Sequence, residues 1–512
     1  MKSFRQIVLD EYFEPSAGKA LRVTLAFILP LIWGMLTGNM EPAVWIAITA
    51  QILSNVKIRG AYPLKLLILS GAVLACAVCA ALGTLTGGNW LVATLLMMAL
   101  AFPGGFVRQS GDHGPGITVG VLLLYLLSLD HPGNMILAGK MFLWVLAGGL
   151  LALLFTLLAW AFVPFSPFRR SIALTWKALS DWLVAFSLQV DTGSMQGPVN
   201  ELDEKELFFR GELNNSMETL SRRQALSHAR QNRFSYQLVE LRRIASFAGN
   251  VVSSLRVLMD AAVKNEQFPA KLFHFLLENM AQVTHRISLS IITHRPEDIY
   301  ATRLSIERVK QSVALFLKNV TDETDARQLQ LSLKDLVAGF EEALGILEKT
   351  TEQNGNMTFF LRNFITGMTI PQNIPWVRFE FNARSFTFRF SLRLALGMGI
   401  GIAAYKYFNI PHGYWIAMTT MIILQPEFGA TITKAFHRVK GTVLGAVTGS
   451  LLFLLPLPLM VNIAIVMVCS FLMTYFLLRN YAVAAFFITV MVIALFHLLE
   501  PVTWQLGVVR VG

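Results

Sequence analysis

Two blocks of apolar sequence, residues 20–163 and 388–508, limit the folds that are open to this chain. Each block contains several runs long enough to cross a lipid bilayer, which takes about 20 residues of α-helix. The composition agrees, since 54% of the 512 residues are hydrophobic and only 15% are charged; soluble domains carry about 25% charged residues. The sequence therefore predicts an all-α polytopic membrane protein.

Glycine, proline and polar residues divide the first block into six predicted helices. Pro30 falls inside the first of them, where it is tolerated because neighbouring membrane helices can satisfy the freed carbonyl. The predicted spans are 20–38, 42–56, 63–86, 90–107, 115–129 and 135–163. The second block is expected to hold a similar bundle.

Lys and Arg residues occur on alternate sides of these predicted spans. They include Lys19, Lys57, Arg108 and Arg169. The intervening loops 37–41, 87–89 and 130–134 contain no Lys or Arg. Because cytoplasmic loops are enriched in basic residues, the N-terminus and the segment after the sixth span are predicted to be cytoplasmic. No cleavable signal peptide is recognisable, so we expect a multi-pass protein of the bacterial inner membrane, targeted by its first helix.

Four parts are predicted along the chain. They are a cytoplasmic N-terminal segment (1–19), a first transmembrane bundle (20–166), a cytoplasmic helical domain (167–387) and a second, truncated transmembrane bundle (388–512). In the cytoplasmic domain apolar residues alternate steps of four and three, as in helices that pack along a seam. One such seam is Leu329, Leu333, Leu336, Phe340, Ala343 and Leu347. A structural or oligomerising domain is the simplest interpretation, and a regulatory or ligand-sensing role is the alternative.

The second apolar block repeats the first, which is the most specific internal signal in the sequence. The matched pairs are Leu21-Arg22 with Leu392-Arg393, WIAIT at 45–49 with WIAMT at 415–419, Gly71 with Gly441, and Arg108 with Arg479. Both repeats are predicted to begin in the cytoplasm. We therefore expect two parallel six-helix bundles related by a pseudo-twofold axis along the membrane normal, with a pathway near that axis.

The second bundle is predicted to be incomplete. The first repeat continues for a full helix after Pro132, whereas only residues 502–512 follow Pro501. A helix of that length is about half the hydrocarbon thickness. The chain is therefore expected to be part of a longer protein.

Short membrane helices at matched positions are the best pointer to a transporter site. The predicted spans 42–56 and 413–424 are both short, and both carry the tryptophan-threonine motif. Trp45 and Trp415 could stack an aromatic ring, while Thr49 and Thr419 could hydrogen-bond a carboxylate. The alternative is that both tryptophans belong to the aromatic belt at the membrane surface.

Two basic residues lie inside the final helix of each repeat. Lys140 follows Pro132 and Arg510 follows Pro501 at nearly the same spacing. A charge at that depth normally faces a polar cavity, so both are candidates for binding an anionic substrate. For Lys140 the alternative is snorkelling toward the outer headgroups.

Further titratable residues are candidates for other steps. Arg438, with Lys434, His437 and Lys440 nearby, could recruit an anion or anchor lipid headgroups. His113, Glu41 and Glu427 are candidates for proton coupling, although solvated loop residues are the simpler interpretation. Cys76 and Cys79 spell C-x-x-C inside an apolar helix, where thiols behave as small hydrophobes. We expect no catalytic residues, no metal and no cofactor.

One segment resembles a known family. The resemblance rests on QPEFGAT at 425–431, Lys434, Arg438, Gly441-Thr442 and Gly445. This pattern resembles the signature of fusaric acid resistance proteins, which are related to bacterial aromatic acid exporters and plant malate channels. The first repeat departs from it, because Ile68 stands where Arg438 stands in the second.

The resemblance implies export of organic anions, aromatic carboxylates in particular, by proton-coupled efflux. A passive anion channel and a membrane scaffold with a partner-binding cytoplasmic domain are the alternatives. No G-x-x-x-x-G-K-[ST] loop is present, so ATP drive is not expected. The expected partners are the lipid bilayer, small organic anions, a periplasmic adaptor protein and further copies of the chain. The net charge of +11 is attributed to topology and headgroups, not to nucleic acid.

Overall fold

The computed structural model describes residues 17–499 with gaps. The gaps are 59–61, 163–165, 192–198, 228–238, 241, 252–269, 294, 320–322, 353–381, 409, 411–412, 455–457 and 478. Within the described part all regular secondary structure is helical, as predicted. The chain divides into two compact units, one within Val163–Pro371 and one formed by Pro15–Phe162 with Gln372–Gly512. We call them the central unit and the apolar unit.

The first half of the apolar unit consists of six helices in a row along the chain. They are α2 (Ala17–Thr37), α3 (Met40–Asn55), α4 (Tyr62–Thr86), α5 (Trp90–Gln109), α6 (Gly114–Ser128) and α7 (Met135–Phe162). Each coincides with a predicted span to within a few residues. The strongest stop signals lie where the helices end, as at Gly38, whose φ of 73° suits glycine.

The second half follows the central unit and contains five described helices. They are α15 (Phe386–Tyr407), α16 (Tyr414–Ile423), α17 (Phe428–Leu452), α18 (Leu459–Phe476) and α19 (Tyr481–Leu499). By length and composition six described helices could cross a membrane: α2, α5, α15 and α18, and most of α4 and α7. The chain is therefore a multi-pass membrane protein by this criterion. The helix α16 has only 10 residues, as expected for the short span.

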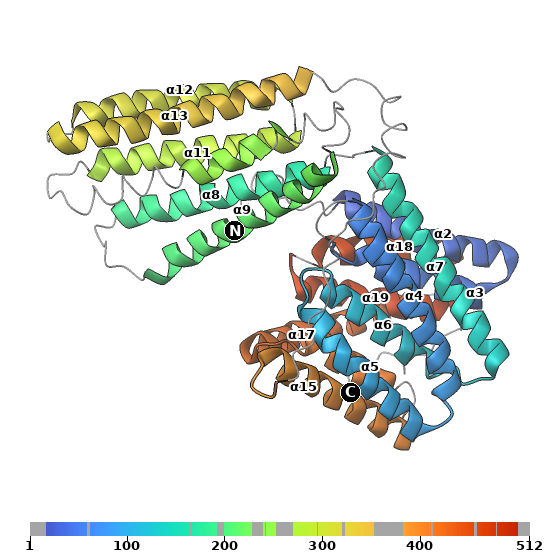
Figure 1. Cartoon of the computed structure of the whole chain (residues 1–512). Helices are drawn as coiled ribbons and strands as arrows, with labels where there is room; N and C mark the ends of the chain where they lie inside the picture. The colour runs from blue at the N-terminus through green and yellow to red at the C-terminus, as the bar shows by residue number, and fades with distance from the viewer. Residues whose placement is uncertain are drawn as a thin grey trace. The chain divides into compact units, whose positions relative to one another are not determined.

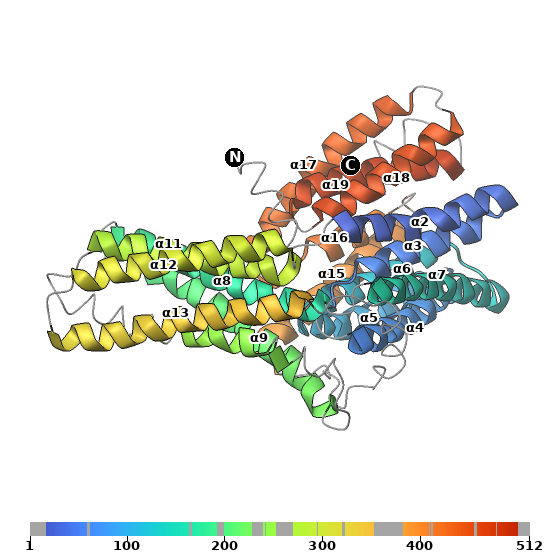
Figure 2. The same ribbon diagram turned by 90° about the horizontal axis from the view of Figure 1, so that it is seen from above.

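The two halves pack on each other through a reciprocal pair of contacts. Helix α15 lies along α5, and α2 lies against α18, so the first helix of each half contacts the fourth helix of the other (Figures 1 and 2). Within each half the third and fifth helices also pack together, α4 on α6 and α17 on α19. The same pairing thus occurs in both halves.

Small residues on α17 make its contact with α19 close. A Cβ at Gly445 would lie 2.7 Å from the carbonyl oxygen of Phe486, and Gly441 abuts the carbonyl of Ala482. In the first half Gly83 lies against Tyr125 in the same way, whereas Gly71 has open space around it. The spaced glycines therefore serve helix packing, which is the simpler of the roles that small residues play in membrane helices.

The central unit is a bundle of long amphipathic helices. They are α8 (Ser166–Asp191), α9 (Val199–Ser227), α11 (Ala270–Thr293), α12 (Pro296–Lys318) and α13 (Glu323–Glu352). Neighbours in contact are α8 with α9 and α11, and α12 with α11 and α13 (Figure 1). Its core is aromatic, with Trp176, Trp182, Phe273, Phe316 and Phe340 fully buried.

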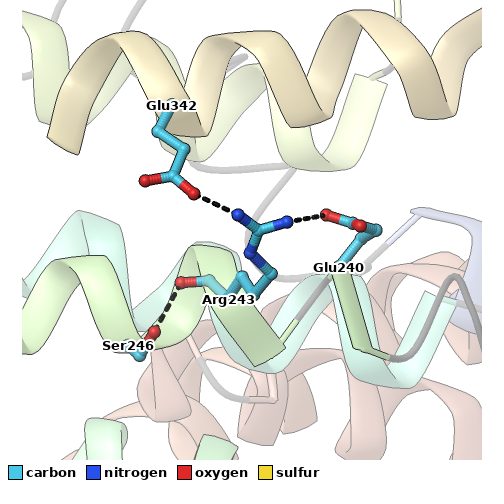
Figure 3. A network of polar contacts seen from close by, with 4 residues as sticks. All are labelled: Glu240, Arg243, Ser246 and Glu342. Atoms are coloured by element: carbon cyan, nitrogen blue, oxygen red, sulfur yellow. Dashed lines mark hydrogen bonds and ion pairs between the residues drawn. The ribbon is translucent and has the colours of Figure 1, made fainter. Parts of the chain in front are cut away.

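The predicted apolar seam of this bundle is confirmed on α13. Leu333, Leu336, Phe340, Ala343 and Leu347 are all buried. Figure 3 shows a polar contact on the surface of the same bundle, where Arg243 donates to Glu342 of α13 and lies 3.5 Å from Glu240. The Arg243 side chain is half exposed, so this ion pair adds little stability.

Candidate anion-binding site

The loop between α16 and α17 has a fixed shape that follows from its sequence. Pro426 follows the end of α16, and Glu427 occupies the N-cap position of α17. The Gln425 backbone N–H donates to Thr431 Oγ1 (3.0 Å), while the Thr431 hydroxyl donates to the Glu427 carbonyl (2.9 Å). Arg393 Nη2 of α15 lies 2.9 Å from the carbonyl oxygens of both Gln425 and Pro426. The loop is thus tied to α15.

Arg108, near the end of α5, is buried beside this loop. Its side chain is 7% exposed, and Nη1 donates to the carbonyl of Met421 at the end of α16 (2.9 Å). The guanidinium lies 5.6 Å from the centre of the Phe390 ring, and Arg393 lies 5.7 Å from the same ring. Both guanidinium groups therefore lie near the same aromatic ring, and cation–π attraction to that ring stabilises their positive charge.

Two further cations come from α17. Lys434 and Arg438 lie four residues apart and so face the same way. Arg438 is 5% exposed and its Nη1 lies 3.5 Å from the Tyr481 hydroxyl oxygen. Lys434 Nζ lies 5.2 Å from the centre of the Tyr481 ring. Lys434 is within electrostatic range of both Arg108 and Arg438, so α5 and α17 bring three positive charges together.

No carboxylate neutralises these cations among the residues that the structure describes. None of the ion pairs found there includes Arg108, Lys434 or Arg438. The acids nearest along the chain, Asp112 after Arg108 and Glu427 before Lys434, are both exposed. Buried positive charges are costly unless a negative group accompanies them, so the site is suited to an anion.

The other end of the α5–α15 pair is built differently. Lys406 Nζ donates to the carbonyls of Gly87 and Leu129 at 3.1 and 2.8 Å. The Tyr405 hydroxyl donates to Asp130 Oδ1 (3.1 Å), and Asp130 lies within electrostatic range of Lys406. Here the cation Lys406 lies beside a carboxylate and two carbonyl oxygens. The net positive charge at this end of the helix pair is therefore smaller.

The tryptophan-threonine motifs lie on α3 and α16, and the second of them ends two residues before Met421, whose carbonyl accepts from Arg108. Trp45 is buried and its ring meets His131 edge-on with the centroids 5.7 Å apart. Thr49 is fully buried and its hydroxyl donates to the Trp45 carbonyl (2.8 Å). Trp415 is half-buried and stacks on Tyr414 with the centroids 5.2 Å apart. Thr419 is also half-buried. The two motifs contact their own surroundings, and substrate binding by them stays a prediction.

The predicted cations and proton-coupling residues are dispersed. Lys140 is exposed on α7, along the same face as exposed Ile136, Leu143 and Leu150. Such a face is the setting that snorkelling requires, and a pathway role for Lys140 stays a prediction. Arg510 lies outside the described residues.

Among the coupling candidates, Glu41 and Glu427 are exposed and His113 is half-buried at the N-cap of α6. Burial lowers the pKa of His113, and the neighbouring Asp112 opposes that shift. Arg438 is the one predicted substrate-binding residue that the structure brings into the basic cluster.

Sequence reasoning missed Arg108 and Arg393 as site residues. The sequence relates Arg108 only to topology and to the repeat, because it lies at a helix end, and Arg393 only to the repeat, because it lies between apolar residues. The signal that could have found them is their pairing across the halves, Arg108 with Arg479 and Arg393 with Arg22. Their convergence with α17 depends on tertiary packing.

Comparison with known proteins finds a family that part of the chain matches. Residues 400–512 match the family described as fusaric acid resistance protein-like. This region contains the motif at 425–445, so the resemblance inferred from that motif is confirmed there. The matched segment supplies Lys434 and Arg438, while Arg108 and Arg393 lie outside it.

Three curated relatives extend this likeness. An uncharacterized protein of Synechocystis sp. is 23% identical over 497 residues, covering 92% of this chain and 63% of the relative. An uncharacterized protein of Haemophilus influenzae is 25% identical over 368 residues, covering 69% and 50%. One of Neisseria gonorrhoeae is 44% identical over 43 residues, covering 8% and 10%. The chain thus spans between half and two thirds of the first two relatives' lengths.

Proposed function

We propose that the protein is a membrane transporter that moves organic anions, aromatic carboxylates in particular, out of the cytoplasm in exchange for protons. The observation that carries the proposal is the cluster formed by the buried Arg108 and Arg438 with the half-buried Lys434. No carboxylate accompanies them among the described residues. Two of the three lie in the segment that matches the fusaric acid resistance protein-like family, whose name refers to an aromatic carboxylic acid.

The geometry suits a carboxylate for three reasons. Arginine offers several N–H donors in a fixed plane that can bind both carboxylate oxygens. Lysine adds a compact point charge with three further N–H donors. The rings of Phe390 and Tyr481 border the cations, so an aromatic acid would find apolar surface beside the charge that binds it.

The arrangement of the two halves supports a transport pathway between them. The reciprocal contacts α5 with α15 and α18 with α2 are what two parallel repeats related by a twofold axis would make. The charge-based topology puts the end of α5, and with it the basic cluster, on the cytoplasmic side. In this proposal an anion enters from the cytoplasm at the cluster and leaves between the halves, with the central unit in the cytoplasm.

Flux measurements on the purified chain in proteoliposomes test the proposal. We expect saturable uptake of radiolabelled benzoate or a pyridine carboxylate that rises with an imposed pH gradient. The Arg438→Gln variant should reduce the rate at least about tenfold, since a charge-assisted hydrogen bond contributes roughly 1.5–3 kcal/mol. Arg479→Gln is the matched control, because Arg479 already bonds Tyr475 (3.0 Å).

The outcomes separate the alternatives. Flux that is independent of the pH gradient and does not saturate would indicate a passive anion channel. Absence of flux for every acid tested would leave the scaffold as the better account. Equal rates for Arg438→Gln and the wild type would remove the basic cluster from the pathway.

A further inference from the structure

A second group of buried polar side chains lies where α2, α3 and α18 meet. Thr24, Ser54 and Thr474 are 3%, 7% and 6% exposed. The hydroxyl oxygen of each has no hydrogen-bond partner among the described residues, and the same holds for Oδ1 of Asn55. These residues play no part in the basic cluster.

These hydroxyls depart from the pattern of most buried hydroxyls in the membrane helices, as Ser391 of α15 and Thr442 of α17 also do. A buried Ser or Thr in a helix ordinarily donates to the carbonyl of the preceding turn. Thr49, Ser128 and Thr489 do so, with bonds of 2.8 Å to Trp45, Leu124 and Ala485. Thr24, Ser54 and Thr474 leave this local bond unmade, so their hydroxyls are available to another group.

The residues are at the same level of the bundle. The Gln51 side-chain amide donates to Ser470 Oγ (2.9 Å) and joins α3 to α18. Ser54 lies three residues after Gln51, and Thr474 lies four after Ser470, so each is within about one helical turn of that bond.

Two contacts between α2 and the antiparallel helix α3 establish the position of Thr24 along the helix axes. Gly34 lies against Ala43, and Lys19 Nζ donates to the Asn55 carbonyl (2.8 Å). Counting along both helices from these contacts puts Thr24 level with residues 50–53. All three hydroxyls therefore lie within about 6 Å of one level along the helix axes.

We propose that Thr24, Ser54 and Thr474 line a hydrated site between the two halves that holds water molecules and is reached from solution. Unsatisfied buried polar groups in native proteins generally mark a bound water or ion. Water both donates and accepts, as three hydroxyls and an amide oxygen require, and a buried water usually makes about three hydrogen bonds. The surrounding side chains, Phe27, Leu31 and Met473 among them, offer no other polar partner.

The consequence is water access at the α2–α18 contact, which is one of the places where the halves meet. A polar solute that crosses the hydrocarbon core of the bilayer needs such a hydrated route. The inference does not depend on the substrate of the basic cluster, because it concerns different residues and a different pair of helices.

Cysteine accessibility tests the proposal directly. The background is the full chain in which alanine replaces Cys76, Cys79 and Cys469. The Ser54→Cys and Thr474→Cys variants in this background are treated in membranes with a small charged methanethiosulfonate. We expect modification at least about tenfold faster than in the Ala47→Cys control, since Ala47 is fully buried on α3. Rates equal to that control would overturn the proposal.

A second measurement covers the case in which the cysteine background fails to fold. Thr24→Val and Thr474→Val remove one hydroxyl with little change of shape. If the hydroxyls bind water, each variant should unfold at a lower temperature than the wild type. If the hydroxyls are buried with no partner, replacing them by an apolar group relieves a penalty, and a higher unfolding temperature would contradict the proposal.

Discussion

The two contacts between the halves use equivalent helices and differ in their polar groups. Where α15 lies on α5, Arg108 crosses to the Met421 carbonyl of α16 (2.9 Å). Where α2 lies on α18, the position that matches Met421 is Gln51, whose side chain bonds Ser470 (2.9 Å). The bond across the first contact is made by the cation Arg108, whereas the bond across the second is made by two neutral side chains, Gln51 and Ser470. The difference indicates that the fold needs the packing and that the charge serves a separate purpose.

The halves differ again along their third helices. Arg438 of α17 is buried beside Tyr481, whereas the matching residue of α4 is Ile68. Gly441 is pressed against α19, whereas the matching Gly71 has nothing within 4 Å. Only the second half has a cation at the position of Arg438, and Gly441 is packed more closely than its match Gly71.

The largest expected effect is on this close packing. A Cβ at Gly441 would collide with the Ala482 carbonyl, so Gly441→Ala should destabilise the protein by about 1–3 kcal/mol, as overpacking does. Gly71→Ala should be neutral or slightly stabilising, because alanine is the better helix former. Thermal unfolding of both variants in detergent measures the difference. Equal unfolding temperatures would mean that α17 and α4 are packed alike.

A smaller effect is expected for the polar bonds between the halves. A double-mutant cycle with Gln51→Leu and Ser470→Ala should give a coupling of about 1 kcal/mol, in the range of hydrogen bonds between membrane helices. The comparison is Thr387 with Gln109, which bond at 2.7 Å and are half-buried. That cycle should give a smaller coupling because water competes there. A larger value for Thr387 and Gln109 would reverse our ranking of the two contacts.

The smallest effect concerns the link between the fourth and fifth helices. In the first half it contains His113, and burial lowers the pKa of that ring. The folded protein therefore favours neutral His113, so its contribution to stability is present above the unfolded pKa of about 6.5 and is lost as the pH falls through the folded value. The loss should be below about 1 kcal/mol because the ring is half exposed.

Unfolding temperatures at pH 7.5 and 5.0 check this sign. The wild type should lose more stability on acidification than His113→Gln does. The second half is predicted to have no such contribution, since Asn480 stands at the start of its fifth helix. A larger loss in His113→Gln would show that the ring is stabilised in its charged form.

The helices could be predicted from the sequence, and the site could not. The helix bounds follow from local signals, namely apolar runs about 20 residues long and breaks at Gly, Pro and Asn, so they hold within a few residues. The seam on α13 follows from its period. These signals act over one or two turns and require no knowledge of neighbours.

The basic cluster depends on contacts between distant segments. Arg108 and Lys434 come together only because α5 packs on α15 and the α16–α17 loop is tied to α15 by Arg393. Nothing near Arg108 in the sequence distinguishes it from a residue that sets topology. The family motif points to Arg438, whereas the prediction for Lys140 rests on its depth and its match with Arg510, and Lys140 lies on an exposed face.

Direct binding of a carboxylate to the purified protein is the most direct test of the central claim. Benzoate should bind to the wild-type chain in a calorimetric titration, and benzamide, which has the same shape without the charge, should not. The Arg108→Gln variant should raise the Kd for benzoate at least about tenfold, or about 1.4 kcal/mol, while Arg479→Gln leaves it unchanged. Equal Kd values for the wild type and Arg108→Gln, or equal binding of benzoate and benzamide, would contradict the account.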